Sequence, residues 1–235
     1  LVKKAGARPL VGDSPGNFFT TEAVYSVYEK TGIKRVAEEE GAELVKFDNS
    51  RIVKGYPIAE AALNAAVIIS LPKLKTHAFT LMTGAIKNTF GIVPGLFKVE
   101  CHRSKPKPKD FAKILVDIFE ITKPQLSIMD GILGMEGDGP AAGEPRKTGL
   151  ILASRDAVSL DRVVSELVGL PECQLTLAQA VTSLACPPNS NAATPGIAQA
   201  RRALCGARLL PVPLLLPAST SPPPHPPGHA HCYQY

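Results

Sequence analysis

The stretch LPKLKTHAFTLMTGAIKNTFGIVPGLFKVECH, residues 71–102, combines lysines, two histidines, an asparagine and three glycines with a single acidic residue. The apolar residues Val67, Ile68 and Ile69 come just before it and predict a buried strand that ends where the polar residues begin. Open α/β sheets bind their ligands at the carboxyl ends of strands. The stretch is therefore predicted to form a ligand site at one end of a sheet.

Outward from this stretch, strand-like and helix-like patterns alternate along the chain. Strands are expected at residues 8–12, 43–47, 51–56, 66–70, 126–129 and 149–153, and helices at 21–40, 58–64, 110–123 and from 156. A glycine-rich loop is expected at residues 134–140. The alternation predicts an α/β fold with a mostly parallel or mixed sheet and flanking helices.

Composition divides the chain into a globular part and a tail. Residues 1–185 are predicted to be one α/β domain, truncated at its N-terminus because the chain begins with Leu1 instead of Met. Residues 186–235 are rich in proline, and no acid follows Glu172. We expect this tail to be disordered, and an out-of-frame or aberrant tail would have the same composition.

Charge, cysteines and hydropathy limit the class of protein. The net charge of +5 is modest, which argues against nucleic acid as a partner, and no apolar run approaches the roughly 18 residues that a membrane helix needs. The five cysteines include no C-x-x-C pair, so the chain supplies no disulfide framework and no iron-sulfur ligand set. These features predict a cytoplasmic protein without membrane contact.

Lys73, Lys75 and His77 occupy every second position of an expected extended segment, so their side chains should share one face. Two cations suit a carboxylate or phosphate, and an imidazole can transfer a proton near neutral pH. Lysines on a solvent-exposed edge strand beside a surface histidine are the structural alternative. The pattern predicts binding of a small anionic molecule.

The following residues extend the candidate site. Gly84 would let a ligand approach the backbone, Asn88 and Lys98 could bind it, and Lys87 could be a point cation, a Schiff-base amine or a covalent attachment site. His102 could form a metal or acid/base pair with His77, although a lone histidine is more often structural.

Acidic residues further along the chain could complete the site. Asp130 and Glu136 could bind a divalent metal together with His102, or neutralise the lysines, although Asp and Gly are also ordinary turn residues. Asp156 and Asp161 are interpreted as a helix cap and a surface charge.

The motifs LPKLKTH, TGAIKNTFG-x-x-PG, K-x-x-x-H, D-G-I-x-G-M-E-G-x-G-P and S-R-D-A-V-S-L-D resemble the uncharacterised, mainly prokaryotic DUF362 family over about residues 5–170. Members of that family often carry a C-terminal ferredoxin-like segment with two four-cysteine motifs. This chain has its proline-rich tail there instead. The resemblance leaves open an enzyme or a non-enzymatic electron-transfer module that docks with a ferredoxin domain on another chain.

A looser likeness links His77, Gly84, Lys87 and His102 to the nickel-pincer lactate racemase family. It implies that Lys87 tethers a cofactor, that His102 binds nickel and that His77 is an acid/base. The leading hypothesis is therefore an enzyme-like domain that binds a small anion or a metal-containing cofactor and performs proton or hydride transfer. The catalytic candidates are His77, Lys87 and His102.

Overall fold

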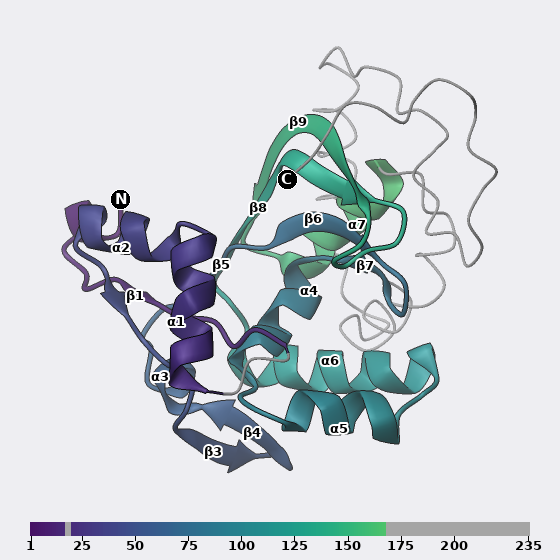
Figure 1. The fold of residues 1–235 in the computed structure, drawn as a ribbon, viewed down its shortest axis with the longest axis horizontal. Coiled ribbons are helices and arrows are strands. Elements are labelled where there is room, and N and C mark those ends of the chain that lie inside the picture. Colours follow the sequence, from purple (N-terminus) through teal and green to yellow (C-terminus); the bar gives the residue numbers. More distant parts are fainter. Residues whose placement is uncertain (17–19, 168–235) are drawn as a thin grey trace, which may run out of the picture. The chain divides into compact units, whose positions relative to one another are not determined.

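The computed structural model describes residues 1–16 and 20–167, which form two compact units (Figure 1). Unit 1 consists of Leu1–Ala66 and Thr89–Pro106, and unit 2 of Val67–Asn88 and the described residues from Lys107 onward. The ligand stretch predicted from sequence is thus divided between the two units after Asn88. The predicted tail, 186–235, lies outside the described residues.

Unit 1 combines short strands with helices. Its elements are a 3₁₀ helix at Lys3–Ala5, β1 (Leu10–Val11), α1 (Thr21–Lys30), α2 (Ile33–Glu40), β2 (Glu43–Leu44), β3 (Ser50–Val53), β4 (Tyr56–Ala59), α3 (Glu60–Leu63), a 3₁₀ helix at Thr89–Ile92, and α5 (Phe97–Ser104). β1 and β2 pair in parallel, and β3 and β4 form an antiparallel hairpin. The buried Tyr28 hydroxyl accepts from the Asp13 N–H (2.7 Å) and donates to the Asp13 carbonyl (2.9 Å), which fixes the segment after β1.

Two predicted elements of unit 1 are each divided in the structure. The helix expected at 21–40 is interrupted at Gly32, whose φ of 77° lies in the left-handed region that glycine adopts without steric cost. The strand expected at 51–56 is instead the β3–β4 hairpin, because Lys54 and Gly55 have φ values of 51° and 85° and turn the chain.

Unit 2 is built around one five-stranded sheet. Its elements are β5 (Ile69–Ser70), β6 (Lys73–His77), β7 (Leu81–Thr83), α4 (Ala85–Asn88), α6 (Pro108–Thr122), β8 (Leu126–Glu136), β9 (Glu144–Ser154) and α7 (Ala157–Leu167). β8 pairs in parallel with β5 and β6 and antiparallel with β9, and β7 pairs antiparallel with β6. The predicted α/β fold with a mixed sheet is confirmed.

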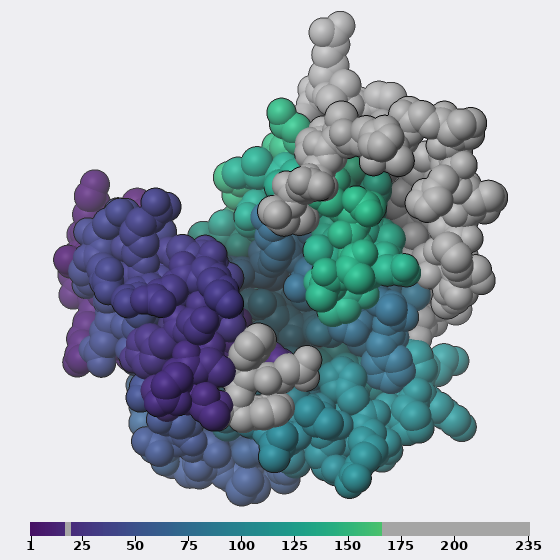
Figure 2. Space-filling view, viewed as in Figure 1, coloured from purple at the N-terminus to yellow at the C-terminus, as the bar shows by residue number. Residues whose placement is uncertain are grey.

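Helices cover one face of this sheet, and the core lies between these helices and the sheet. The buried core residues are Leu74, Met82, Ala85, Ile86, Val116, Met129, Ala157, Leu160 and Val164. The strand predicted as buried at 66–70 is shorter and more exposed than expected, with Val67 59% and Ile69 38% exposed. The sheet's other face reaches the surface, where Ile151 of β9 (green in Figure 2) is 65% exposed.

The predicted glycine-rich loop at 134–140 is strand over its first three residues, because β8 continues to Glu136, and residues 137–140 form bends and turns. Gly131 and Gly134 permit this: a Cβ on either would come within 3.1 Å of Leu74, so the glycines let the neighbouring strand β6 pack closely. Asp130 and Glu136 therefore lie on a rigid strand and not on a flexible loop.

Candidate functional site

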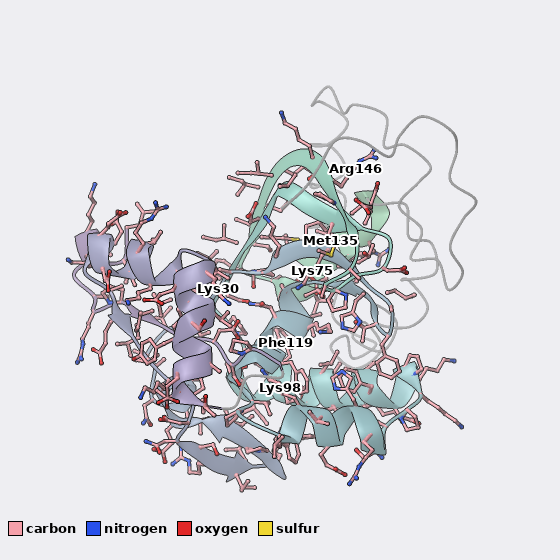
Figure 3. The ribbon with its side chains drawn as sticks, viewed as in Figure 1. Lys30, Lys75, Lys98, Phe119, Met135 and Arg146 are labelled. Carbon is pink, nitrogen blue, oxygen red and sulfur yellow. The ribbon has the colours of Figure 1, made fainter. Side chains whose placement is uncertain are left out.

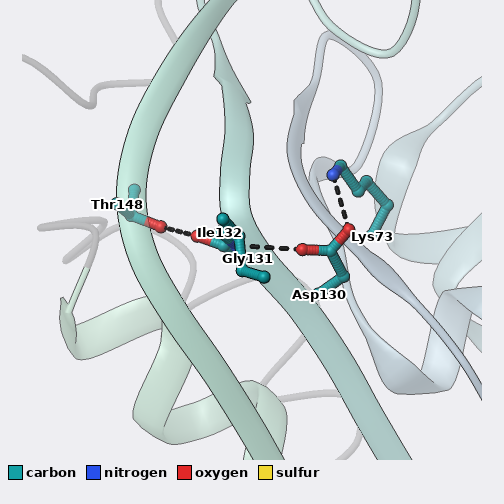
Figure 4. Close-up of polar contacts among 5 residues, drawn as sticks. All are labelled: Lys73, Asp130, Gly131, Ile132 and Thr148. Carbon is teal, nitrogen blue, oxygen red and sulfur yellow. Dashed lines mark hydrogen bonds and ion pairs between the residues drawn. The ribbon is translucent and has the colours of Figure 1, made fainter.

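β6 carries Lys73, Lys75 and His77 at alternate positions, as the sequence predicts. The β6–β8 register places Lys73 opposite Asp130, and Lys73 Nζ donates to Asp130 Oδ2 at 2.7 Å (Figure 4). Asp130 Oδ1 also accepts from the Ile132 N–H at 2.9 Å. The hydrogen bond from Lys73 lowers the pKa of Asp130, and the Asp130 carboxylate offsets the positive charge of Lys73.

Lys75 lies in the middle of the sheet, opposite Thr83 of β7 and Met135 of β8 (Figure 3). Its amine donates to the Pro140 carbonyl at 3.5 Å, a long contact compared with the charged Lys73–Asp130 pair.

His77 is buried at the end of β6, with 8% of its surface exposed. Its Nδ1 accepts hydrogen bonds from the backbone N–H groups of Phe79 (3.1 Å) and Thr80 (3.2 Å). A nitrogen that accepts from two N–H groups carries no proton, so the proton of the neutral ring is on Nε2. The backbone thereby fixes both the orientation of His77 and its tautomer.

Asp161 of α7 is a member of the site region that sequence reasoning missed. Its carboxylate accepts from the N–H groups of Ala85 (2.6 Å) and Ile86 (3.0 Å), the first residues of α4. Burial raises the pKa of Asp161 to about 7, although the two backbone hydrogen bonds oppose the change. The interpretation of Asp161 as a surface charge is wrong, because it is only 6% exposed.

The same carboxylate explains why residue 84 is a glycine. A Cβ at Gly84 would overlap the Asp161 carboxylate, so the close approach at this glycine is made by a side chain of the protein itself. Helical spacing was the available signal for Asp161, because it lies four residues after Ala157 and three before Val164, both buried. An acid on the apolar face of a helix needs a partner.

Lys87 and Asn88 follow on α4 and are half-buried. Asn88 Nδ2 donates to Ser70 Oγ at 2.9 Å, which ties the end of α4 to β5. Ser70 is registered beside Ser127 of β8, whose buried hydroxyl has no hydrogen-bond partner within the part of the chain that the structure describes.

Lys98 and His102 lie one turn apart on α5 in unit 1. Lys98 is 7% exposed, donates to the Ser14 carbonyl and lies 5.7 Å from the centre of the Phe90 ring. Burial lowers its pKa to about 8, against an opposing effect of Asp13. His102 Nδ1 donates to the Lys98 carbonyl at 2.7 Å, so in the neutral ring Nε2 is an acceptor.

Unit 2 therefore contains most of the predicted site: Lys73, Lys75, His77, Gly84, Lys87, Asn88, Asp130 and Glu136. Unit 1 contains Lys98 and His102. Glu136 lies 3.5 Å from Arg146, and burial raises the pKa of its carboxyl. Among residues 1–16 and 20–167, no three His, Cys, Asp or Glu side chains are grouped as a metal site, so metal binding stays a prediction.

The fold and the Lys/His-bearing strand-helix segment define an α/β protein with a candidate anion site on its sheet. The chain belongs to the family described as "Domain of unknown function (DUF362)", whose sequence pattern matches residues 1–166. A second pattern, "MgsA AAA+ ATPase C terminal", matches residues 153–235, most of which lie outside the described residues. The looser likeness to lactate racemases is not shown by these matches.

One similar protein is the "Thylakoid-associated protein sll1697" of Synechocystis sp. (strain ATCC 27184 / PCC 6803 / Kazusa). It is 36% identical over 177 residues, which cover 72% of this chain and 54% of the relative. The chain thus spans about half the length of that protein. No solved structure matches the chain. Among the described residues, no helix is long and apolar enough to cross a bilayer.

Proposed function

We propose that unit 2 binds a small anionic ligand at the segment β6–β7–α4 and transfers a proton to or from it. The observation that carries this proposal is His77, a buried imidazole whose orientation and tautomer are fixed by two backbone N–H groups. It lies two positions after Lys75 on the same strand, so a cation and a fixed proton donor project from one face of β6.

Side chains, and not a helix N-terminus, would bind the anion. In phosphate-binding loops the first N–H groups of a helix hold the ligand. Here the Ala85 and Ile86 N–H groups already bind Asp161, so the TGAIKN motif does not offer them to a phosphate. We assign this role to Lys75 of β6 and Lys87 of α4, and not to Lys73, which forms an ion pair with Asp130.

The chemistry follows from the tautomer. His77 Nε2–H can donate a hydrogen bond to a ligand oxygen and stabilise negative charge that develops there, or pass its proton to that oxygen. If the Nε2 proton passes fully to that oxygen, His77 is left as an imidazolate, which takes the proton back when the oxygen releases it. Removing a carbon-bound proton from the ligand needs a base other than His77, because Nδ1 accepts from the backbone and Nε2 carries the proton. A hydride transfer would need a bound acceptor in addition, and a divalent metal or metal-containing cofactor remains a second way to polarise the same oxygen.

Titration calorimetry with inorganic phosphate and L-lactate tests the binding step. We expect Lys75→Ala and Lys87→Ala each to weaken binding about tenfold, which corresponds to about 1.4 kcal/mol. Lys113→Ala is the matched control, because this α6 lysine has a side chain that is 70% exposed. Equal affinity in all four proteins would place the anion site elsewhere. Exchange of the lactate α-proton in deuterated water is a separate assay, which tests the proposed role of His77.

Association with a membrane surface is a second candidate, favoured by the name of the thylakoid-associated relative. Ile69, Ile132 and Ile151 are exposed on the strands of unit 2 and could contact lipid. Cosedimentation with phosphatidylglycerol vesicles checks this, with Ile151→Ser as the variant expected to lose binding. A docking function with an acidic ferredoxin-like partner would instead weaken steeply with salt.

A further inference from the structure

We infer that Asp161 is a positioning residue for the proposed anion site: its side chain, on α7, holds the short helix α4 in the place where Lys87 and Asn88 serve the ligand. The inference rests on the proposed function for the ligand and on the structure for the contact. It assigns a role to a carboxylate that lies 75 residues from the helix it binds.

The helix α4 has four residues, Ala85–Asn88, and is too short to persist without tertiary contacts. Both ends are fixed by side chains from other elements of unit 2. Asp161 binds the N–H groups of Ala85 and Ile86 at the start, and Ser70 accepts from the Asn88 carboxamide at the end. Because Lys87 lies between these two attachments, its position depends on both.

Alternative partners for the N-terminus of α4 are poor. The residue before the helix, Gly84, has no side chain to cap it, and the Asp161 carboxylate fills the space that a side chain would need. The Thr83 hydroxyl is buried without a partner among the described residues, so it does not cap α4 in place of Asp161. Without Asp161, the N–H groups of Ala85 and Ile86 would lose the carboxylate that accepts from both of them.

The surroundings of Asp161 do not compensate its charge with a salt bridge in the described structure. Asp156 precedes α7, and α7 itself also carries Arg162 and Glu166. The elements packed against α7 are α4, β8 and β9, and their charged residues are Lys87, Asp130, Glu136, Glu144, Arg146 and Lys147. Asp156 disfavours the charged form of Asp161, and burial disfavours it more strongly. The two backbone N–H groups are therefore its principal stabilising partners.

The test uses the ¹⁵N-labelled full chain as wild type, Asp161→Asn and the control Asp156→Asn, which makes the same chemical change at the exposed residue just before α7. NMR of the Ala85 and Ile86 amides reports the cap, and the Asn88 carboxamide reports the far end of α4. Calorimetry with inorganic phosphate reports the ligand. We expect Asp161→Asn to shift all three NMR signals and to weaken phosphate binding about tenfold, with the control unchanged.

The outcomes separate the two proposals. An Asn88 carboxamide signal that stays in place in Asp161→Asn overturns the positioning role, whatever happens to phosphate. A shifted signal with no phosphate binding by the wild type supports positioning and overturns the anion site. If Asp161→Asn does not fold, Gly84→Ala is the second variant, because its methyl group displaces the Asp161 carboxylate. A pH titration of the wild type is the second measurement, and it must move the NMR signals of Ala85, Ile86 and Asn88 together. Separate movement of these signals overturns the inference.

Discussion

Replacing Asp161 by Asn should change how the stability of the protein depends on pH. The carboxyl is buried, and its pKa is raised from 3.8 to about 7. Between these two values the folded chain holds a proton that the unfolded chain has released. Unfolding therefore releases a proton in this window, and the free energy of unfolding must fall as the pH rises.

The size of the effect follows from competing terms. The free-energy cost of burying an unpartnered carboxylate is larger than the stabilisation that hydrogen bonds normally contribute. The two N–H groups of Ala85 and Ile86 offset the cost by about 1.5–3 kcal/mol each, which leaves the charged form disfavoured. The slope is then about 1.4 kcal/mol per pH unit, and the difference between pH 3.8 and about 7 is on the order of 4 kcal/mol.

Urea denaturation from pH 4 to pH 8, followed through NMR signals of unit 2, measures this slope. The Asn side chain resembles the protonated acid at every pH, so Asp161→Asn should lack the slope that the wild type shows. Asp156→Asn should retain a slope, because the buried Asp161 carboxyl is still present and Asn can still cap α7. Loss of the Asp156 charge, which also disfavours charged Asp161, should only lower the pH at which the slope ends. Parallel curves for the wild type and Asp161→Asn would refute the argument.

Three further predictions concern other residues. Burial lowers the pKa of Lys98 from 10.5 to about 8. Between pH 8 and 10.5 the unfolded chain therefore binds more protons at Lys98 than the folded chain, and the free energy of unfolding of the wild type should rise with pH relative to that of Lys98→Met. Denaturation of both proteins at these pH values measures the difference. Gly84→Ala should cost about 1–3 kcal/mol in denaturant, because its methyl overlaps the Asp161 carboxylate. Lys73→Ala should cost less than about 1 kcal/mol, because the ion pair with Asp130 is half-exposed, and NMR titration should show the Asp130 pKa rising.

Local patterns in the sequence predict the elements whose stability is local. The alternation around Lys73–His77 gives β6, and apolar residues at helical spacing give α6, which the structure places at Pro108–Thr122. Asp156 also caps α7 as predicted. These features depend on residues fewer than five positions apart, so one sequence contains the information they need.

Features that depend on distant contacts could not be predicted in the same way. Periodicity does not reveal that β8 continues through Gly131 and Gly134, because those glycines are tolerated in the strand only where Leu74 of β6 packs against them. The division into two units, which separates Lys98 and His102 from the other candidates, depends on long-range packing that no local motif records.

His77 and His102 show why a motif that pairs two histidines does not define their chemistry. The backbone donates two hydrogen bonds to Nδ1 of His77 but accepts one from Nδ1 of His102, so the neutral rings have opposite tautomers. Nε2 of His77 is then a proton donor, whereas Nε2 of His102 is an acceptor that suits a base or a metal. Exchange of these roles would require breaking backbone hydrogen bonds, so each histidine must be tested for a different function.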